Sequence, residues 1–170
     1  MKKRSGFVRG KKAQETMGIP FTFIFGMFLI VIFIIIAFIG IKAFLGFQDT
    51  SKVGLFYDDF QKEVSSALSS DQTTRSFKID LPSGILKVCF ANLSARINGL
   101  QEDYNQIERF ESYGANLFLV PPGKAEDLEF KTIKGINITK ITERRNPYCL
   151  NATGSLNIKK GLYSKLVWIE

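Results

Sequence analysis

The chain has 170 residues, of which 45% are hydrophobic, and it carries a formal net charge of +7. It contains no histidine, which excludes every catalytic triad, general base or metal site that depends on an imidazole. It also lacks the G-x-S-x-G, H-E-x-x-H, P-loop and G-x-G-x-x-G patterns, so the sequence predicts no enzyme of those classes, no cofactor and no metal ion.

Residues 1–20 form a short basic leader. Six Lys and Arg side chains stand against a single acid, Glu15: they are Lys2, Lys3, Arg4, Arg9, Lys11 and Lys12. After Lys42 the chain is almost neutral, with 16 basic and 15 acidic residues. The positive charge is therefore concentrated at one end as a topology signal, and nucleic acid is not a predicted partner.

The next segment, residues 21–41, reads FTFIFGMFLIVIFIIIAFIGI and contains no charge. As a helix it would be about 31 Å long, close to the hydrocarbon thickness of a bilayer. We therefore predict an uncleaved transmembrane helix, with the lipid bilayer as its partner. Only Lys42 and Lys52 follow it closely, so the positive-inside rule predicts a single-pass plasma-membrane protein with a cytoplasmic N-terminus and an extracytoplasmic C-terminal domain.

An amphipathic helical extension is predicted over residues 42–70. Val53, Phe56, Phe60 and Val64 recur at three- and four-residue steps, with polar side chains on the opposite face. Because no proline interrupts this region, we expect one long helix, or two in tandem, from about residue 20 to about residue 69.

Residues 71–170 change to a period of two and predict a β-rich extracytoplasmic domain with one core. A short helix is expected over Asp103–Phe110. The expected strands are Phe77–Leu81, Ile85–Ala91, Asn116–Val120, Leu128–Ile133, Ile136–Ile141, Leu156–Lys159 and Leu162–Ile169. The predicted fold class is α+β, a long N-terminal transmembrane-plus-amphipathic helix packed on a mostly antiparallel β domain.

Two cysteines, Cys89 and Cys149, lie in this domain. In an exported domain they most simply form one disulfide, and two unpaired buried thiols are the alternative. Three N-x-S/T sequons begin at Asn92, Asn137 and Asn151, all on the predicted outer side. They are candidate glycosylation sites of a surface glycoprotein.

The remaining polar groups give little support for catalysis. Adjacent strand residues point to opposite faces, so Ser164 and Lys165 are poorly placed for proton transfer. Glu126, Asp127 and Glu129 form the densest acidic cluster, but they lack a calcium-loop pattern. We therefore predict a protein that is not an enzyme.

The order of basic leader, apolar helix, amphipathic helix and β domain resembles type IV pilin-like proteins. The residues Lys11-Lys12-Ala13-Gln14 look like the processing site of archaeal class III signal peptides. The resemblance implies cleavage between Ala13 and Gln14 by a prepilin-type peptidase, and assembly with copies of itself or with other pilin-like subunits. Pilins usually carry Glu at the fifth mature position, where this chain has Gly18.

The β region is also similar to uncharacterised archaeal single-pass membrane proteins, through Leu86–Ala91 and Asn146–Cys149. The leading hypothesis is a non-enzymatic, membrane-anchored cell-surface protein acting as a pilin-like structural or assembly subunit. The alternative is a signal-anchored extracellular binding module that does not polymerise.

Overall fold

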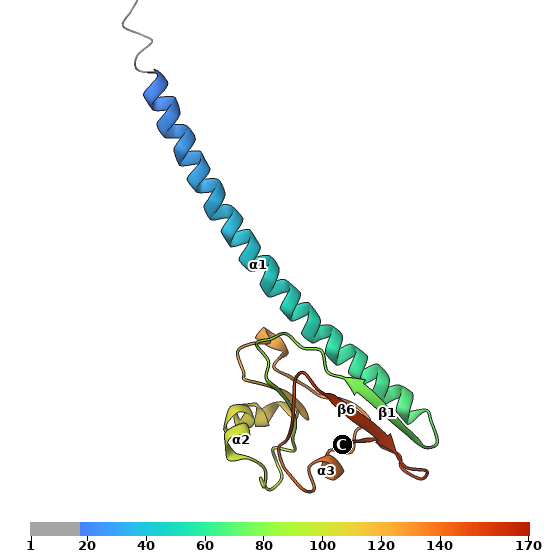
Figure 1. The fold of residues 1–170 in the computed structure, drawn as a ribbon. Helices are drawn as coiled ribbons and strands as arrows, with labels where there is room; N and C mark the ends of the chain where they lie inside the picture. The colour runs from blue at the N-terminus through green and yellow to red at the C-terminus, as the bar shows by residue number, and fades with distance from the viewer. Residues whose placement is uncertain (1–17) are drawn as a thin grey trace, which may run out of the picture. The chain divides into compact units, whose positions relative to one another are not determined.

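The computed structural model describes residues 18–170, and Figure 1 traces their fold. One long helix, α1 (Gly18–Leu68, 51 residues), precedes a domain of antiparallel strands and short helices. The predicted α+β class and the single long helix are therefore confirmed. The chain divides into two compact units between Leu45 and Gly46, and α1 contributes to both.

The first unit contains the apolar part of α1. From Phe21 onward this helix is long and apolar enough to cross a membrane. A helix suits such a sequence because each backbone N–H and C=O bonds within the segment, so none has to be satisfied by water.

The second unit, residues 46–170, is built on the C-terminal part of α1. The apolar residues that recur along this part of the helix are fully or almost fully buried: Val53, Phe56, Tyr57, Phe60, Val64 and Ala67. The predicted amphipathic helix is thus confirmed, and its apolar stripe forms one wall of the main core.

A three-stranded antiparallel sheet lies beside this part of α1 (Figure 1), in the order β1 (Thr73–Lys78), β6 (Ser155–Lys160) and β7 (Trp168–Ile169). Phe77 pairs with Leu156 across the sheet, and the Phe77 ring lies 5.3 Å from that of Phe60 on α1. One face of the sheet therefore packs on the helix.

The second sheet has the order β4 (Phe130–Lys131), β3 (Leu117–Val120), β2 (Lys87–Phe90) and β5 (Tyr148–Asn151), and all its pairs are antiparallel. Both faces of its central strands are buried. Val88 and Leu119 belong to the core that includes α1. Cys89 and Phe118 belong to a second core on the opposite face.

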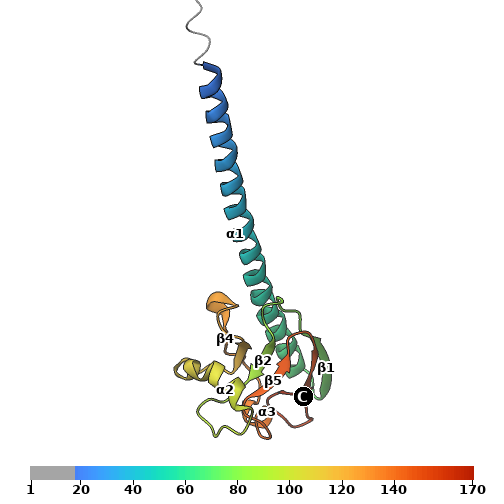
Figure 2. The same ribbon diagram turned by 60° about the vertical axis from the view of Figure 1, so that its left-hand side comes forward.

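The second core is covered by α2 (Gln101–Ile107) and the 3-10 helix η1 (Glu108–Tyr113), which supply Ile107 and Phe110. Figure 2 shows α2 beside the strands β2 and β4. The helix predicted over Asp103–Phe110 is therefore present, as a short α-helix that continues into a 3-10 helix.

Four of the local predictions are wrong. The strand expected over Phe77–Leu81 forms earlier in the chain, as β1, and shares only Phe77 and Lys78 with the expected range. Residues 136–141 form no strand: Ile136 makes one bridge to Val167, and α3 (Ile138–Ile141) follows, because the Asn137 side chain accepts the N–H of Lys140 and starts a helical turn. Of the strand expected over Leu162–Ile169, only β7 forms. Another 3-10 helix, η2 (Glu126–Leu128), shortens the strand expected from Leu128.

Candidate functional site

The largest chemically distinctive surface is the apolar part of α1. Its big side chains are exposed along the whole segment, from Phe21 at 72% to Phe44 at 60%. Soluble proteins rarely expose a continuous apolar surface of this extent, and such a surface marks contact with lipid or with another protein. These residues are the strongest functional feature in the described part of the chain.

Polar contacts fix the C-terminal part of α1 to the domain. The buried Tyr57 hydroxyl donates a 2.8 Å hydrogen bond to the carbonyl of Leu128. At the end of the helix, Lys160 Nζ donates 2.6 Å hydrogen bonds to the carbonyls of Leu68 and Ser70. A strand lysine thereby satisfies the last carbonyl of the helix, at Leu68, and a carbonyl of the turn that follows it.

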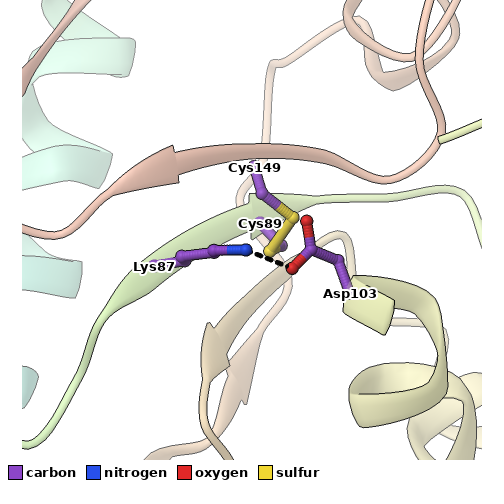
Figure 3. Close-up of a disulfide and its surroundings, with 4 residues drawn as sticks. All are labelled: Lys87, Cys89, Asp103 and Cys149. Atoms are coloured by element: carbon purple, nitrogen blue, oxygen red, sulfur yellow. Dashed lines mark hydrogen bonds and ion pairs between the residues drawn. A yellow bond between two sulfur atoms is a disulfide. The ribbon is translucent and has the colours of Figure 1, made fainter. Parts of the chain in front are cut away.

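The two cysteines form the predicted disulfide. Cys89 on β2 and Cys149 on β5 are directly opposite each other in the sheet, and Figure 3 shows the bond between them. Beside it, Lys87 Nζ lies 2.6 Å from the carboxylate of Asp103, whose side chain is only 4% exposed. The ion pair links β2 to α2 next to the disulfide, so both join elements around the second core.

The three sequons occupy different environments. Asn151 is exposed at the end of β5. Asn137 is half-buried, and its side-chain oxygen caps α3. Asn92 is also half-buried, and both its backbone N–H and its carbonyl bond to the side chain of Asn146. Asn151 is therefore the most accessible of the three asparagines for modification.

Asn146 is a buried polar residue whose structural role is not evident from the sequence. Its side chain accepts the N–H of Asn92 and donates to the carbonyls of Asn92 and Arg96. Its backbone carbonyl accepts from the N–H groups of Asn98 and Gly99. One side chain, only 2% exposed, thus organises the loop between β2 and α2.

A cleft of about 450 Å³ opens beside α3 and β7. Trp168 forms part of its wall, and Lys140 Nζ lies 3.0 Å from the centre of the indole ring. The cleft is also lined by Tyr148, Arg144, Arg145, Glu143 and Glu170. In Figures 1 and 2 the end of the chain, marked C, lies beside α3, which explains how residues from two distant segments share one cleft.

Glu170 is held at one side of this cleft. Its carboxylate pairs with Lys159 and accepts a 3.4 Å hydrogen bond from the indole N–H of Trp168. The hydrogen bond from Lys159, and secondly that from Trp168, lowers the pKa of the Glu170 carboxyl below its usual value. The carboxylate is therefore stabilised in its charged form.

The structure does not bring the candidate catalytic groups together into a reactive arrangement. Ser164 donates its hydroxyl to the carbonyl of Leu166, within a turn. Glu129 pairs with Arg109 at 3.1 Å and accepts the N–H of Gly123. Among residues 18–170, no group of three or more His, Cys, Asp or Glu side chains is placed to hold a metal ion.

Ala13 and Gln14, the residues of the candidate processing site, lie outside the described residues. Comparison of the chain with protein-family models, with curated proteins and with solved structures gives no match.

Proposed function

We propose that the chain is a non-enzymatic, membrane-anchored cell-surface protein and a pilin-like structural or assembly subunit. Residues 21–41 cross the plasma membrane once. The basic leader lies in the cytoplasm, and the domain that follows the span is presented outside the cell.

The observation that carries the anchoring is the exposed apolar part of α1. Burying one Phe or Ile side chain is worth about 1.5–3 kcal/mol, so a run of such residues favours a bilayer strongly over water. The segment holds 21 residues without a charge, from Phe21 to Ile41, which matches the length that a bilayer requires.

The charge distribution and the disulfide support the proposed orientation. Basic side chains are concentrated before the span, as expected on the cytoplasmic side. The Cys89–Cys149 disulfide lies in the domain after the span, and such bonds persist in oxidising compartments outside the cytoplasm. The exposed sequon at Asn151 is compatible with a surface glycoprotein.

The pilin-like role is supported by α1, which contains the apolar segment and also contributes to the core of the domain. The helix that would anchor the chain continues into the wall of the main core, where Phe60 and Val64 are completely buried. The same helix therefore supplies both the apolar segment and part of the core of the domain. This arrangement suits a subunit that is held or pulled through its N-terminal helix.

The alternative role is an anchored binding module that does not polymerise. Gly18 favours it, because the resemblance to pilins implies a Glu at that position for assembly. The two roles share the anchor and the orientation, and they differ in N-terminal processing and in filament formation.

The deciding experiment is the intact mass of the membrane-extracted, deglycosylated chain. We expect a start at Gln14, and we expect replacement of Lys11 and Lys12 by Gln to block that cleavage. Replacement of Lys2 and Lys3 by Gln removes the same charge and is the matched control. A start at Met1 or Lys2 would contradict the pilin-like role and favour the binding module.

Two further measurements separate the parts of the proposal. Loss of surface filaments in a deletion strain, seen by electron microscopy, is expected for a structural subunit, and unchanged filaments would contradict that role. Release of the full chain by alkaline carbonate would contradict the anchor itself. Protease digestion of intact cells should remove the domain, and its protection would contradict the orientation.

A further inference from the structure

We propose that the cleft beside α3 and β7 binds a small ligand that carries an oxyanion, a carboxylate or a phosphate. This goes beyond anchoring or assembly, and it does not depend on either. The inference comes from three features of the cleft: its excess of cations, the carboxylate already held at its edge, and its size.

The cleft has more positive than negative charge. Three cations, Lys140, Arg144 and Arg145, line it together with the two carboxylates of Glu143 and Glu170. One of these carboxylates, Glu170, is already paired with Lys159. The only ion pair among these groups in residues 18–170 is that of Lys159 with Glu170. Cations that share one cleft repel each other, and an anion placed between them lowers that energy.

The two arginines are well suited to hold such an anion. Arg144 and Arg145 are exposed, and among the described residues neither takes part in an ion pair. A guanidinium presents its N–H groups in a fork that matches the two oxygens of a carboxylate or phosphate. Their donors are therefore available to a ligand.

The side chain of Glu170 shows that this side of the cleft can bind a carboxylate. It is held jointly by the ammonium of Lys159 and the indole N–H of Trp168. An ammonium and an N–H donor are the kinds of group that bind an oxyanion, and here they already hold a carboxylate at the edge of the cleft. The carboxylate of Glu170 is the same chemical group that we propose for the ligand.

The size of the cleft favours a small molecule over a protein partner. Its volume of about 450 Å³ falls within the range of small-ligand pockets, roughly 300–1,000 Å³. Trp168 and Tyr148 provide aromatic surface for the uncharged part of a ligand. The ligand class is therefore a small organic acid or phosphate ester.

The cleft contains its own reporter, because Trp168 is the only tryptophan in the chain. Lys140 lies over its indole ring, so an anion that draws the ammonium away changes the environment of the fluorophore. We would titrate the detergent-solubilised full chain with citrate and, separately, with inorganic phosphate. Sodium chloride at matched ionic strength controls for screening.

We expect a saturable change in tryptophan fluorescence with at least one of the two anions and none with chloride. Replacing Arg144 and Arg145 together by Gln should weaken that binding at least tenfold, as expected for the loss of two charge-assisted contacts. Arg96→Gln removes an exposed arginine that does not line the cleft, and it should bind like the unaltered chain.

Three results would overturn the proposal. The first is a response to both anions that does not saturate or that chloride reproduces. The second is equal binding by the Arg144/Arg145 double variant. The third is equal weakening by Arg96→Gln, which would indicate general electrostatic attraction. Unchanged unfolding of the double variant verifies that its fold is intact, and none of these outcomes depends on whether the protein polymerises.

Discussion

The side chain of Gln61 and the backbone of Lys134 form two reciprocal hydrogen bonds. Gln61 Nε2 donates to the carbonyl of Lys134 at 3.1 Å, and the N–H of Lys134 donates to Gln61 Oε1 at 2.9 Å. The amide thus imitates a neighbouring peptide group and joins α1 to the loop between β4 and α3. It is a polar clamp beside the apolar contact of the same helix.

Gln61→Ala should lower the free energy of unfolding by about 1–2 kcal/mol, because both hydrogen bonds are lost. Gln48→Ala is the matched control, since Gln48 lies in the same helix, is exposed, and has no side-chain hydrogen bond among those found in residues 18–170. Denaturant unfolding of the full chain in detergent measures the difference. Equal stability of the two variants would show that the clamp contributes nothing.

The same loop approaches α1 at Gly135, where an added Cβ would overlap the side chain of Leu68. Gly135 has φ of +87°, and a Cβ built there would lie 2.3 Å from Leu68 Cδ1. Gly123 has a matching φ of +86° with nothing within 4 Å of such a Cβ. Comparing alanine at Gly123 with alanine at Gly135 therefore separates the cost of backbone strain from the cost of steric overlap.

Gly123→Ala should therefore cost about 1 kcal/mol through the positive φ alone. Gly135→Ala should cost an additional 1–3 kcal/mol or so, because the methyl group must displace a packed side chain. Denaturant unfolding midpoints of the two variants test this order. Equal losses would mean that Leu68 moves aside freely.

Asn146→Ala should loosen the loop between β2 and α2. The change leaves the backbone groups of Asn92 and the carbonyl of Arg96 without their partner, at a cost of roughly 2–4 kcal/mol. Hydrogen exchange should accelerate across residues 92–99. Asn157→Ala is the control, because that asparagine is exposed on β6, and the proposal fails if both variants exchange alike.

The helical part of the fold could be predicted because it rests on periodicity. The uncharged run and the three- and four-residue spacing of Val53, Phe56 and Phe60 both appear in the sequence and follow directly from helix geometry. The disulfide was predicted from the number of cysteines and the expected compartment. Its register, Cys89 opposite Cys149, depends on sheet pairing that spacing alone does not specify.

One error occurs where a polar contact outweighs a local pattern, and another where the pattern itself is weak. The alternation after Ile136 suggested a strand, but the cap at Asn137 starts a helix. Strand β5 was missed because its four residues, beginning at Tyr148, are half-buried or exposed and lack a clear alternation.

The cleft at Trp168 could not be predicted from the sequence. Lys140 and Trp168 are 28 positions apart along the chain, and packing of α3 against β7 brings them together. No local pattern records such a contact. The same holds for the bonds from Asn146 to Asn92 and Arg96, which join a loop to residues about 50 positions away.

The buried hydroxyl of Tyr57 predicts a loss of stability in alkali. Burial, and secondly the charge of Glu129, raises the pKa of Tyr57 far above its ordinary value of about 10. Above pH 10 the unfolded chain therefore releases a proton that the folded chain retains. The contribution of Tyr57 to the free energy of unfolding is thus complete below pH 10 and declines as pH rises toward the folded pKa.

Tyr57→Phe should lower the free energy of unfolding by about 1 kcal/mol at pH 7, because the hydrogen bond to Leu128 is lost, and should reduce the decline above pH 10. Tyr163→Phe, at a side chain that is 94% exposed, is the control. Unfolding free energies between pH 7 and 11 provide the test, and parallel curves for all three proteins would contradict it.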